Sequence, residues 1–165
     1  MLAARLLDPS AGAIAADLCA APGGKTGHLW ELMGGRGKLW AAEVEPARRP
    51  MLEQALRRLH GSDPSIRILD RIDPAAADAA ARCDRVLIDA PCQALGLIGR
   101  HPEIRWDRRL DRRDPVTRTQ RRLLDIGARW VRPGGRLLWA TCSPTRMENE
   151  ELVEGWLADN FGWQL

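Results

Sequence analysis

The sequence of 165 residues contains no apolar run that reaches the roughly 18 residues needed to cross a membrane. The stretch from Met1 to Leu7 is too short, and too quickly interrupted, to act as a secretory signal. The chain shows no internal repeat and no low-complexity segment. These absences argue against a membrane protein or a membrane partner and predict a location in the cytoplasm.

Cysteine is scarce, and no two cysteines form a Cys-x-x-Cys pair. The four cysteines are Cys19, Cys83, Cys92 and Cys142. The histidines lie far from them in sequence, so we expect no zinc or other metal site. Without an export signal we expect no disulfide framework either. A lone cysteine is usually a small buried side chain, which is our interpretation of Cys83 and, within a loop, of Cys19.

Positive and negative charges are nearly equal in number over the whole chain, but they are unevenly distributed along the sequence. Hydrophobic residues make up 45% and charged residues 28%, which is typical of a globular protein and predicts one domain over residues 1–165. The net charge is +3, yet arginines gather between residues 100 and 122. They are Arg100, Arg105, Arg108, Arg109, Arg112, Arg113, Arg118, Arg121 and Arg122. This surplus suits a phosphate backbone, and a solvated, ion-paired surface is the alternative.

Short apolar runs alternate along the chain with stretches of helical periodicity. We expect strands at residues 13–19, 38–42, 66–69, 85–88 and 136–140, and the start of a sixth at 161–165. We expect helices within residues 1–12 and at 24–34, 46–61, 74–81, 117–131 and 147–159. A turn is predicted at Pro133-Gly134-Gly135, and a long irregular segment at residues 90–115. The alternation predicts an α/β fold with a mainly parallel sheet and helices on both faces.

One stretch, Asp17 to Thr26 with the sequence DLCAAPGGKT, lies between the first strand and the first long helix. Gly23 and Gly24 lack a Cβ, so the backbone can turn tightly and lie against a ligand. The free N–H groups at the start of the helix would then face that ligand. The stretch therefore predicts a ligand-binding turn.

Five chemically useful side chains end predicted strands or follow them closely. They are Cys19, Glu43, Asp70, Asp89 and Cys142. In a parallel sheet these positions share one edge, where ligands bind. Glu43 has the position of a carboxylate that takes the two hydroxyls of a ribose, with Glu45 the next candidate, and Asp70 could contact an adenine amino group. The pattern predicts an adenosine-containing cofactor, and spacing alone leaves a dinucleotide and S-adenosylmethionine open.

Two cysteines are expected near the same edge. Cys92 follows a proline in a glycine-containing loop, and Cys142 lies between Thr141 and Ser143 just past a strand. A thiolate at such a place can act as a covalent nucleophile. Their converging positions favour this role over that of a buried apolar side chain.

These motifs resemble those of the RNA cytosine-5 methyltransferases, in particular the branch that acts on bacterial small-subunit ribosomal RNA. DLCAAPGGKT resembles the cofactor loop of that family. The stretch from Asp89-Ala-Pro-Cys92 to Arg100-His-Pro-Glu-Ile-Arg-Trp106 is similar to its fourth motif, and Thr141-Cys-Ser143 with Glu148-Asn-Glu150 to its sixth. Gln120 and Pro133-Gly-Gly135 stand where the family has similar residues. The resemblance runs from about Leu6 to the end of the sequence.

The resemblance implies a Rossmann-like methyltransferase domain that binds S-adenosylmethionine and acts on RNA. The cofactor residues that it implies are Cys19, Ala20, Ala21, Pro22, Gly23, Gly24, Lys25, Glu43, Asp70 and Asp89. It implies Cys142 as the thiolate that adds to carbon 6 of cytosine and Cys92 as the group that assists loss of the carbon-5 proton. Asp89 would supply a proton at ring nitrogen 3, and Lys25 would orient the base or the cofactor. RNA phosphates would be held by the arginine-rich segment, chiefly Arg100, His101, Arg105, Arg108 and Arg109.

The sequence departs from the family pattern at three places. Gln93-Ala94 stands where small residues usually follow the fourth-motif cysteine, Glu43 replaces the more frequent Asp, and the surroundings of Asp70 lack the usual glycines. The family's preceding RNA-binding domains and its complete final hairpin are absent from this sequence, so we expect a longer protein or a partner chain to supply them, and the fifth strand to lie at a sheet edge. Two alternatives remain open. One is a methyltransferase without a cysteine nucleophile, and the other is a truncated, non-catalytic module that binds RNA or serves in assembly.

Overall fold

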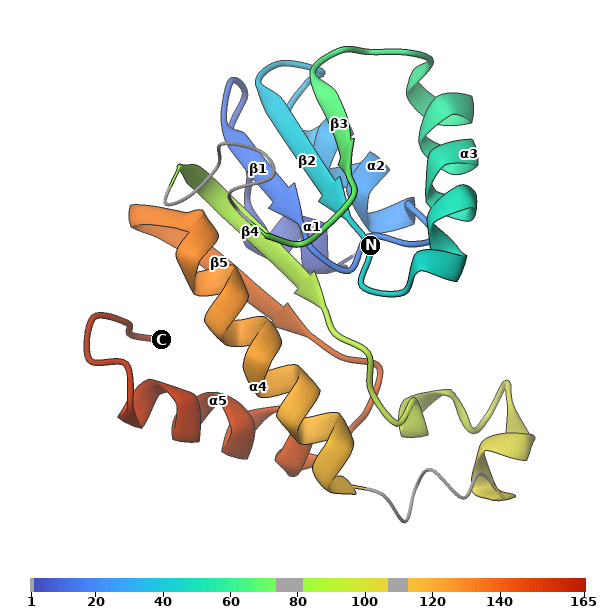
Figure 1. Ribbon diagram of the computed structural model, residues 1–165, viewed down its shortest axis with the longest axis vertical. Helices are drawn as coiled ribbons and strands as arrows, with labels where there is room; N and C mark the ends of the chain where they lie inside the picture. The colour runs from blue at the N-terminus through green and yellow to red at the C-terminus, as the bar shows by residue number, and fades with distance from the viewer. Residues whose placement is uncertain (1, 74–81, 107–112) are drawn as a thin grey trace. The chain divides into compact units, whose positions relative to one another are not determined.

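The computed structural model describes residues 2–73, 82–106 and 113–165 (Figure 1). Its sheet has five strands in the order β3-β2-β1-β4-β5. The strands are β1 (Ile14–Asp17), β2 (Lys38–Ala42), β3 (Ile66–Leu69), β4 (Cys83–Asp89) and β5 (Val131–Ala140). β1 pairs in parallel with β2 and β4, and β2 pairs in parallel with β3. The predicted α/β fold with a mainly parallel sheet is confirmed.

Helices separate most of the strands, as predicted. They are α1 (Leu2–Leu7), α2 (Gly24–Leu32), α3 (Arg49–His60), α4 (Arg113–Trp130) and α5 (Glu150–Ala158). Short 3₁₀ helices are η1 (Pro46–Arg48), η3 (Leu95–Leu97), η4 (Pro102–Trp106) and η6 (Arg146–Glu148). The helix predicted at residues 74–81 lies outside the described residues. No helix within the described ranges is both long and apolar enough to span a membrane.

The chain forms two compact units. The first comprises Met1–Asp89 and Ile126–Leu138, and the second comprises Ala90–Asp125 and Trp139–Leu165. The predicted cofactor residues belong to the first unit. Both cysteines that the sequence marks as catalytic, Cys92 and Cys142, belong to the second. The single-domain organisation stays a prediction.

The core of the first unit follows from the alternation of side chains along β2. Leu39 packs in a cluster with Leu7 of α1 and Leu29 of α2. The next residue, Trp40, points to the opposite face, where its ring centroid lies 5.9 Å from that of Trp130 at the end of α4. Helices therefore cover both faces of this part of the sheet, as the sequence predicts.

In the second unit, α5 is joined to α4 by polar contacts. Trp156 Nε1 donates a hydrogen bond to Asp125 Oδ1 at 2.7 Å, and Arg121 forms an ion pair with Asp159 at 2.5 Å. Trp156 is buried. Two polar side chains of α4, Arg121 and Asp125, thus hold α5 in place.

Two predictions at the end of the chain need correction. β5 begins at Val131, so the predicted turn at Pro133-Gly134-Gly135 lies within the strand, where Gly134 has a φ of +73°. The predicted sixth strand at residues 161–165 is wrong. A strand needs a neighbour for its backbone hydrogen bonds, whereas here Trp163 N–H bonds to Asn160 O at 3.0 Å in a turn. The Trp163 ring instead packs edge-on against Trp156, with centroids 5.5 Å apart.

Candidate active site

The turn between β1 and α2 occupies the carboxyl end of the central strand of the first unit. Gly23 N–H donates to Ala20 O at 2.7 Å, and the Ala21–Pro22 peptide bond is cis. Gly23 has a φ of +103°, which favours glycine. No side chain caps the start of α2. The first N–H groups of this helix are therefore available to an anionic or polar ligand.

Glu43, directly after β2, holds this turn in place. It is 8% exposed, and its two carboxylate oxygens accept hydrogen bonds from Ala21 N and Glu45 N, both at 2.9 Å. Arg48 Nη2 donates to Ala21 O at 2.7 Å. A carboxylate oxygen can accept more than one hydrogen bond. Glu43 can therefore fix the turn and still bind the hydroxyls of a ribose.

Gly23 has a packing role that the sequence did not indicate. A Cβ placed there would lie 3.2 Å from Ala55 Cβ and 3.3 Å from Leu52 Cδ1, both on α3. The turn thus packs closely against the helix behind it. A larger side chain would move the turn away from α3 as well as strain its backbone.

Asp17 and Thr26, the ends of the motif DLCAAPGGKT, contact each other beneath the turn. Thr26 Oγ1 donates to Asp17 Oδ2 at 2.7 Å, while Asp17 Oδ1 has no hydrogen-bond partner among the described residues. Burial raises the pKa of Asp17 to about 7, and the hydrogen bond from Thr26 only partly offsets this rise. Asp17 therefore holds a proton in the folded protein up to nearly neutral pH.

The substitution Asp17→Asn is expected to change how stability depends on pH. The unfolded carboxyl loses its proton near pH 4, at about its reference pKa, and the folded one near pH 7. Between these values the folded state binds more protons, so the free energy of unfolding falls as pH rises. From about pH 5 to about pH 8 the native protein should lose about 3 kcal/mol relative to the variant. Urea unfolding of both proteins at both pH values measures this, and equal changes in the two would contradict it.

Lys25 and Asp89 are 64 residues apart in sequence and form an ion pair in the first unit. Lys25 Nζ lies 2.5 Å from Asp89 Oδ2, and each side chain is 31% exposed. Lys25 belongs to the first turn of α2, and Asp89 ends β4, which pairs with β1. The parallel register explains why these two predicted site residues meet. Both remain accessible enough to contact a bound molecule.

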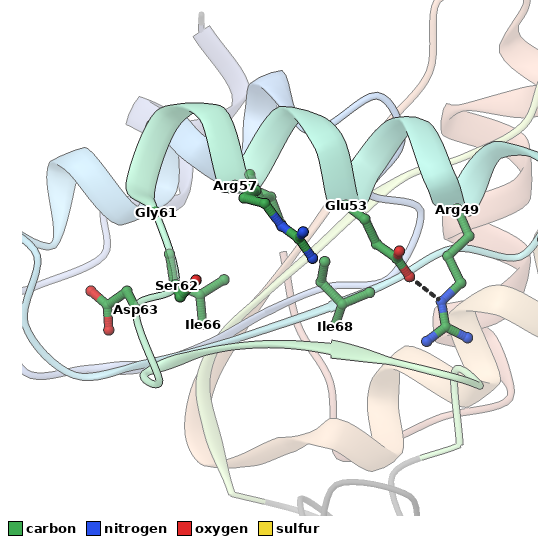
Figure 2. Close-up of a pocket in the computed structure, with 9 residues that line it drawn as sticks. Arg49, Glu53, Arg57, Gly61, Ser62, Asp63, Ile66 and Ile68 are labelled. Carbon is green, nitrogen blue, oxygen red and sulfur yellow. Dashed lines mark hydrogen bonds and ion pairs between the residues drawn. The ribbon is translucent and has the colours of Figure 1, made fainter.

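Asp70 follows β3 and contacts α3. Its side chain is 81% exposed and forms an ion pair with Arg49 of α3. Arg49 also lines a cavity of about 370 Å³ between α3 and β3, where it contacts Glu53 (Figure 2). A second cavity of about 460 Å³ includes Ile14 and Lys38, at the amino ends of β1 and β2. No predicted cofactor residue lines either cavity, so neither marks the predicted site.

The two candidate catalytic thiols meet in the second unit. Cys92 Sγ and Cys142 Sγ are 3.0 Å apart, so either can donate a hydrogen bond to the other. Cys92 is half-buried and Cys142 is exposed. The other two cysteines are less suited to form a thiolate, because burial raises the pKa of Cys19 well above its usual value and that of Cys83 to about 12. Within the part of the chain that the structure describes, no three His, Cys, Asp or Glu side chains are grouped to hold a metal ion.

The described residues of the basic segment that are predicted to bind RNA are exposed. Arg100, His101 and Arg105 lie at the surface, and His101 Nδ1 is 3.1 Å from Glu103 Oε1. Arg108 and Arg109, also predicted to bind RNA, lie outside the described residues. Sequence reasoning gave no role to Trp106, although it is 80% exposed. An exposed tryptophan next to arginines is the signal that could have identified it as a base-stacking candidate.

Sequence reasoning also gave no role to three polar residues that contact the cysteine loops. Gln120 and Glu148 are fully buried, and Asn149 is half-buried. Gln120 and Glu148 bond to the backbone beside Cys92, and Asn149 to the backbone beside Cys142. The sequence motifs include all three residues but do not reveal these contacts, of which those of Gln120 and Glu148 span 29 and 55 residues.

The residues of the first unit fit S-adenosylmethionine by the chemistry of their donors and acceptors. A buried carboxylate at Glu43 suits ribose hydroxyls, and the uncapped start of α2 suits a carboxylate group. The Lys25–Asp89 pair offers one cation and one anion beside that helix start. These groups would hold the cofactor at the carboxyl ends of β1, β2 and β4.

The comparisons with known proteins agree with this fit. The profile of the family described as 16S rRNA methyltransferase RsmB/F matches residues 4–165. Ribosomal RNA small subunit methyltransferase B of Shewanella oneidensis is 40% identical over 94% of this chain and 36% of its own length. The solved structure of PH0851 has a TM-score of 0.88 and 40% identity over 96% of this chain and 36% of that one. NSun6 from Pyrococcus horikoshii, solved with the S-adenosylmethionine analogue SFG, has a TM-score of 0.80 and 30% identity over 96% of this chain and 40% of its own.

The sheet, the glycine turn and these likenesses define the class as the Rossmann-like, S-adenosylmethionine-dependent methyltransferases. Within that class, the chain belongs to the RsmB/F family of 16S rRNA methyltransferases. It spans little more than a third of the length of the curated relatives that it matches.

Proposed function

We propose that this chain transfers a methyl group from S-adenosylmethionine to carbon 5 of a cytosine in small-subunit ribosomal RNA, through a covalent adduct with Cys142. The observation that carries the proposal is the pair of accessible thiols, Cys92 and Cys142, 3.0 Å apart. Methyl transfer to a ribose hydroxyl or to a protein side chain needs no such pair. The name of the Shewanella oneidensis relative, a ribosomal RNA small subunit methyltransferase, supports ribosomal RNA as the substrate.

The thiols solve a specific chemical problem, because carbon 5 of cytosine is a weak nucleophile. The Cys142 thiolate forms a bond to carbon 6, and the displaced electron pair makes carbon 5 nucleophilic. S-adenosylmethionine supplies the electrophilic methyl group. Cys92 then takes the proton from carbon 5, the carbon 5–carbon 6 double bond re-forms, and the bond between carbon 6 and Cys142 breaks. Both thiols are therefore used once in each cycle.

Lys25 and Asp89 have the chemistry to manage the proton at the pyrimidine ring. Addition at carbon 6 increases electron density at nitrogen 3, which a donated proton stabilises. Asp89, ionised beside the Lys25 ammonium 2.5 Å away, passes a proton from that ammonium to nitrogen 3. The proton returns by the same path when the carbon 5–carbon 6 double bond re-forms. The target base must leave its stack before its ring face can be attacked.

Identification of the methylated nucleoside tests the proposal. The protein is incubated with labelled S-adenosylmethionine and a 16S rRNA transcript, and the RNA is digested to nucleosides. We expect the label in 5-methylcytidine. Label in a ribose-methylated nucleoside would assign the chain to a methyltransferase without a cysteine nucleophile. RNA binding with no transfer, by protein that binds the cofactor, would assign it to a non-catalytic module.

Trp106→Ala is expected to weaken RNA binding without changing cofactor binding. A base stacked on an aromatic ring contributes about 1–3 kcal/mol, so affinity for RNA should fall about tenfold. Fluorescence anisotropy with a short RNA at fixed salt measures this change. Phe161→Ala is the matched control, because Phe161 is also exposed, at 94%, but lies outside the basic segment. Equal affinities of both variants and the native protein would argue against a stacking role.

A further inference from the structure

The loops that carry Cys92 and Cys142 are joined by two adjacent side chains, Glu148 and Asn149. Glu148 ends η6, and Asn149 is the N-cap position of α5. All of these residues belong to the second unit. Glu148 bonds to the backbone on both sides of Cys92, on one side through Gln120. Asn149 bonds to the Ser143 backbone and the Thr141 side chain, on either side of Cys142.

Glu148 holds the Cys92 loop. Its Oε1 accepts hydrogen bonds from Gln93 N and from Gln120 Nε2, both at 3.0 Å. Gln120 Nε2 also donates to Pro91 O at 2.9 Å. The residues immediately before and after Cys92 are therefore both fixed through one buried carboxylate.

Asn149 holds the Cys142 loop in the same way. Its Nδ2 donates to Ser143 O at 2.8 Å, and its Oδ1 accepts a hydrogen bond from Thr141 Oγ1 at 2.8 Å. The residues on either side of Cys142 are thus fixed through one amide side chain. Thr145 Oγ1 donates to Glu148 Oε2 at 3.0 Å, and Asn149 Nδ2 donates to Thr145 O at 2.8 Å, so the two sets of contacts share Thr145.

The two loops also touch directly. Gly96 N–H donates to Cys142 O at 2.9 Å, and a Cβ at Gly96 would lie 2.6 Å from that oxygen. Only glycine permits this approach of the Cys92 loop to the Cys142 backbone. In the same two loops the sulfur atoms of Cys92 and Cys142 lie 3.0 Å apart.

These buried polar groups lower the stability of the fold, so stability alone does not explain their presence. Glu148 is fully buried. The groups that donate hydrogen bonds to its carboxylate are all neutral: a backbone amide, a side-chain carboxamide and a hydroxyl. Burial of a carboxylate and of an unpaired carbonyl oxygen lowers stability. Gln120 Oε1 is such an atom, without a partner among the described residues. Apolar side chains could fill the same volume, but they could not fix the backbone beside each cysteine.

We propose that Glu148 and Asn149 are positioning residues that set the distance between the two thiols. The proposal rests on the proposed function, in which Cys142 bonds to carbon 6 and Cys92 takes the proton from carbon 5. Those two atoms are bonded neighbours in one ring. The two sulfurs must therefore reach adjacent atoms of one substrate, and a change of about 1 Å in their placement can cost about a hundredfold in rate.

The rate at which the two thiols cross-link reports their distance without any RNA. Diamide, a diazene, accepts two electrons and two protons from the thiols, which leaves a disulfide and a hydrazine. Mass spectrometry after alkylation counts the remaining thiols of Cys92 and Cys142. Glu148→Ala and Asn149→Ala should each slow cross-linking about tenfold or more. Glu148→Gln should restore a near-native rate, because its carbonyl can accept from Gln93 N and Gln120 and its amide can donate to Thr145 Oγ1.

Matched measurements separate positioning from loss of folding. Glu150→Ala removes an exposed neighbouring carboxylate and should leave the cross-linking rate unchanged. In methyl transfer, the alanine variants should lower kcat while KM for RNA stays near the native value. Native cross-linking rates in both folded alanine variants would overturn the proposal, and if Glu148→Ala does not fold, Asn149→Ala decides. A native protein that transfers no methyl group would refute the proposed function, while the cross-linking rates would still decide the positioning role.

Discussion

Replacing Cys92 with alanine should trap the protein on its RNA. In the proposed reaction Cys142 bonds to carbon 6 first, and release requires removal of the carbon-5 proton by Cys92. Without the second thiol the covalent adduct accumulates after methyl transfer. A denaturing gel of Cys92→Ala with RNA and S-adenosylmethionine should show a band of protein joined to RNA. Methyl transfer should stop after about one equivalent for each protein molecule.

Cys142→Ala should behave in the opposite way. It removes the nucleophile, so no adduct should form and methyl transfer should fall by at least about a thousandfold. Cys83→Ala is the matched control, because Cys83 is buried at the start of β4 and its raised pKa keeps it a thiol. An adduct in Cys142→Ala, or none in either single variant while the native protein transfers methyl groups, would show that the roles are assigned wrongly.

Glu43→Ala should weaken S-adenosylmethionine binding by about a hundredfold, since hydrogen bonds to a charged group contribute about 1.5 kcal/mol or more each. The variant loses the acceptors for the ribose hydroxyls. It also leaves Ala21 N and Glu45 N without the carboxylate that now holds the glycine turn. Isothermal titration calorimetry with S-adenosylmethionine measures the loss.

Two further variants assign the effect to Glu43 itself. Glu45→Ala removes an exposed carboxylate two residues away, and it should bind the cofactor with near-native affinity. Glu43→Gln keeps an acceptor for one backbone N–H. Its affinity for S-adenosylmethionine should lie between those of the native protein and Glu43→Ala. If Glu45→Ala lost affinity and Glu43→Ala did not, the ribose contact would belong to Glu45.

The parallel sheet could be predicted because its signal is local. Strands such as Lys38–Ala42 and Ile66–Leu69 are short, mostly apolar runs, and the structure has both with the predicted bounds. The sixth strand failed for the opposite reason. Residues 161–165 have a suitable composition, but a strand also requires a partner, which no local pattern supplies.

Some features of the candidate site could likewise be predicted from the sequence, and others could not. The sequence places Glu43 and Asp89 at strand ends, and the parallel register then brings Lys25 to Asp89. The packing of Gly23 against α3 was missed because it depends on the position of a helix about thirty residues further along the chain. The contacts proposed to position the two thiols, such as the hydrogen bond from Gln93 N to Glu148 Oε1, span 55 residues. Such contacts become visible only once the chain is folded.

The most direct test of the central claim uses RNA in which the cytidines carry fluorine at carbon 5. Fluorine cannot leave as a proton does, so a native enzyme that uses the proposed reaction is held on its substrate after methyl transfer. With S-adenosylmethionine and this RNA, the native protein should form an adduct that survives denaturation. Peptide mass spectrometry should place the methylated base on Cys142. An adduct on another residue, or methyl transfer to this RNA without any adduct, would contradict the account.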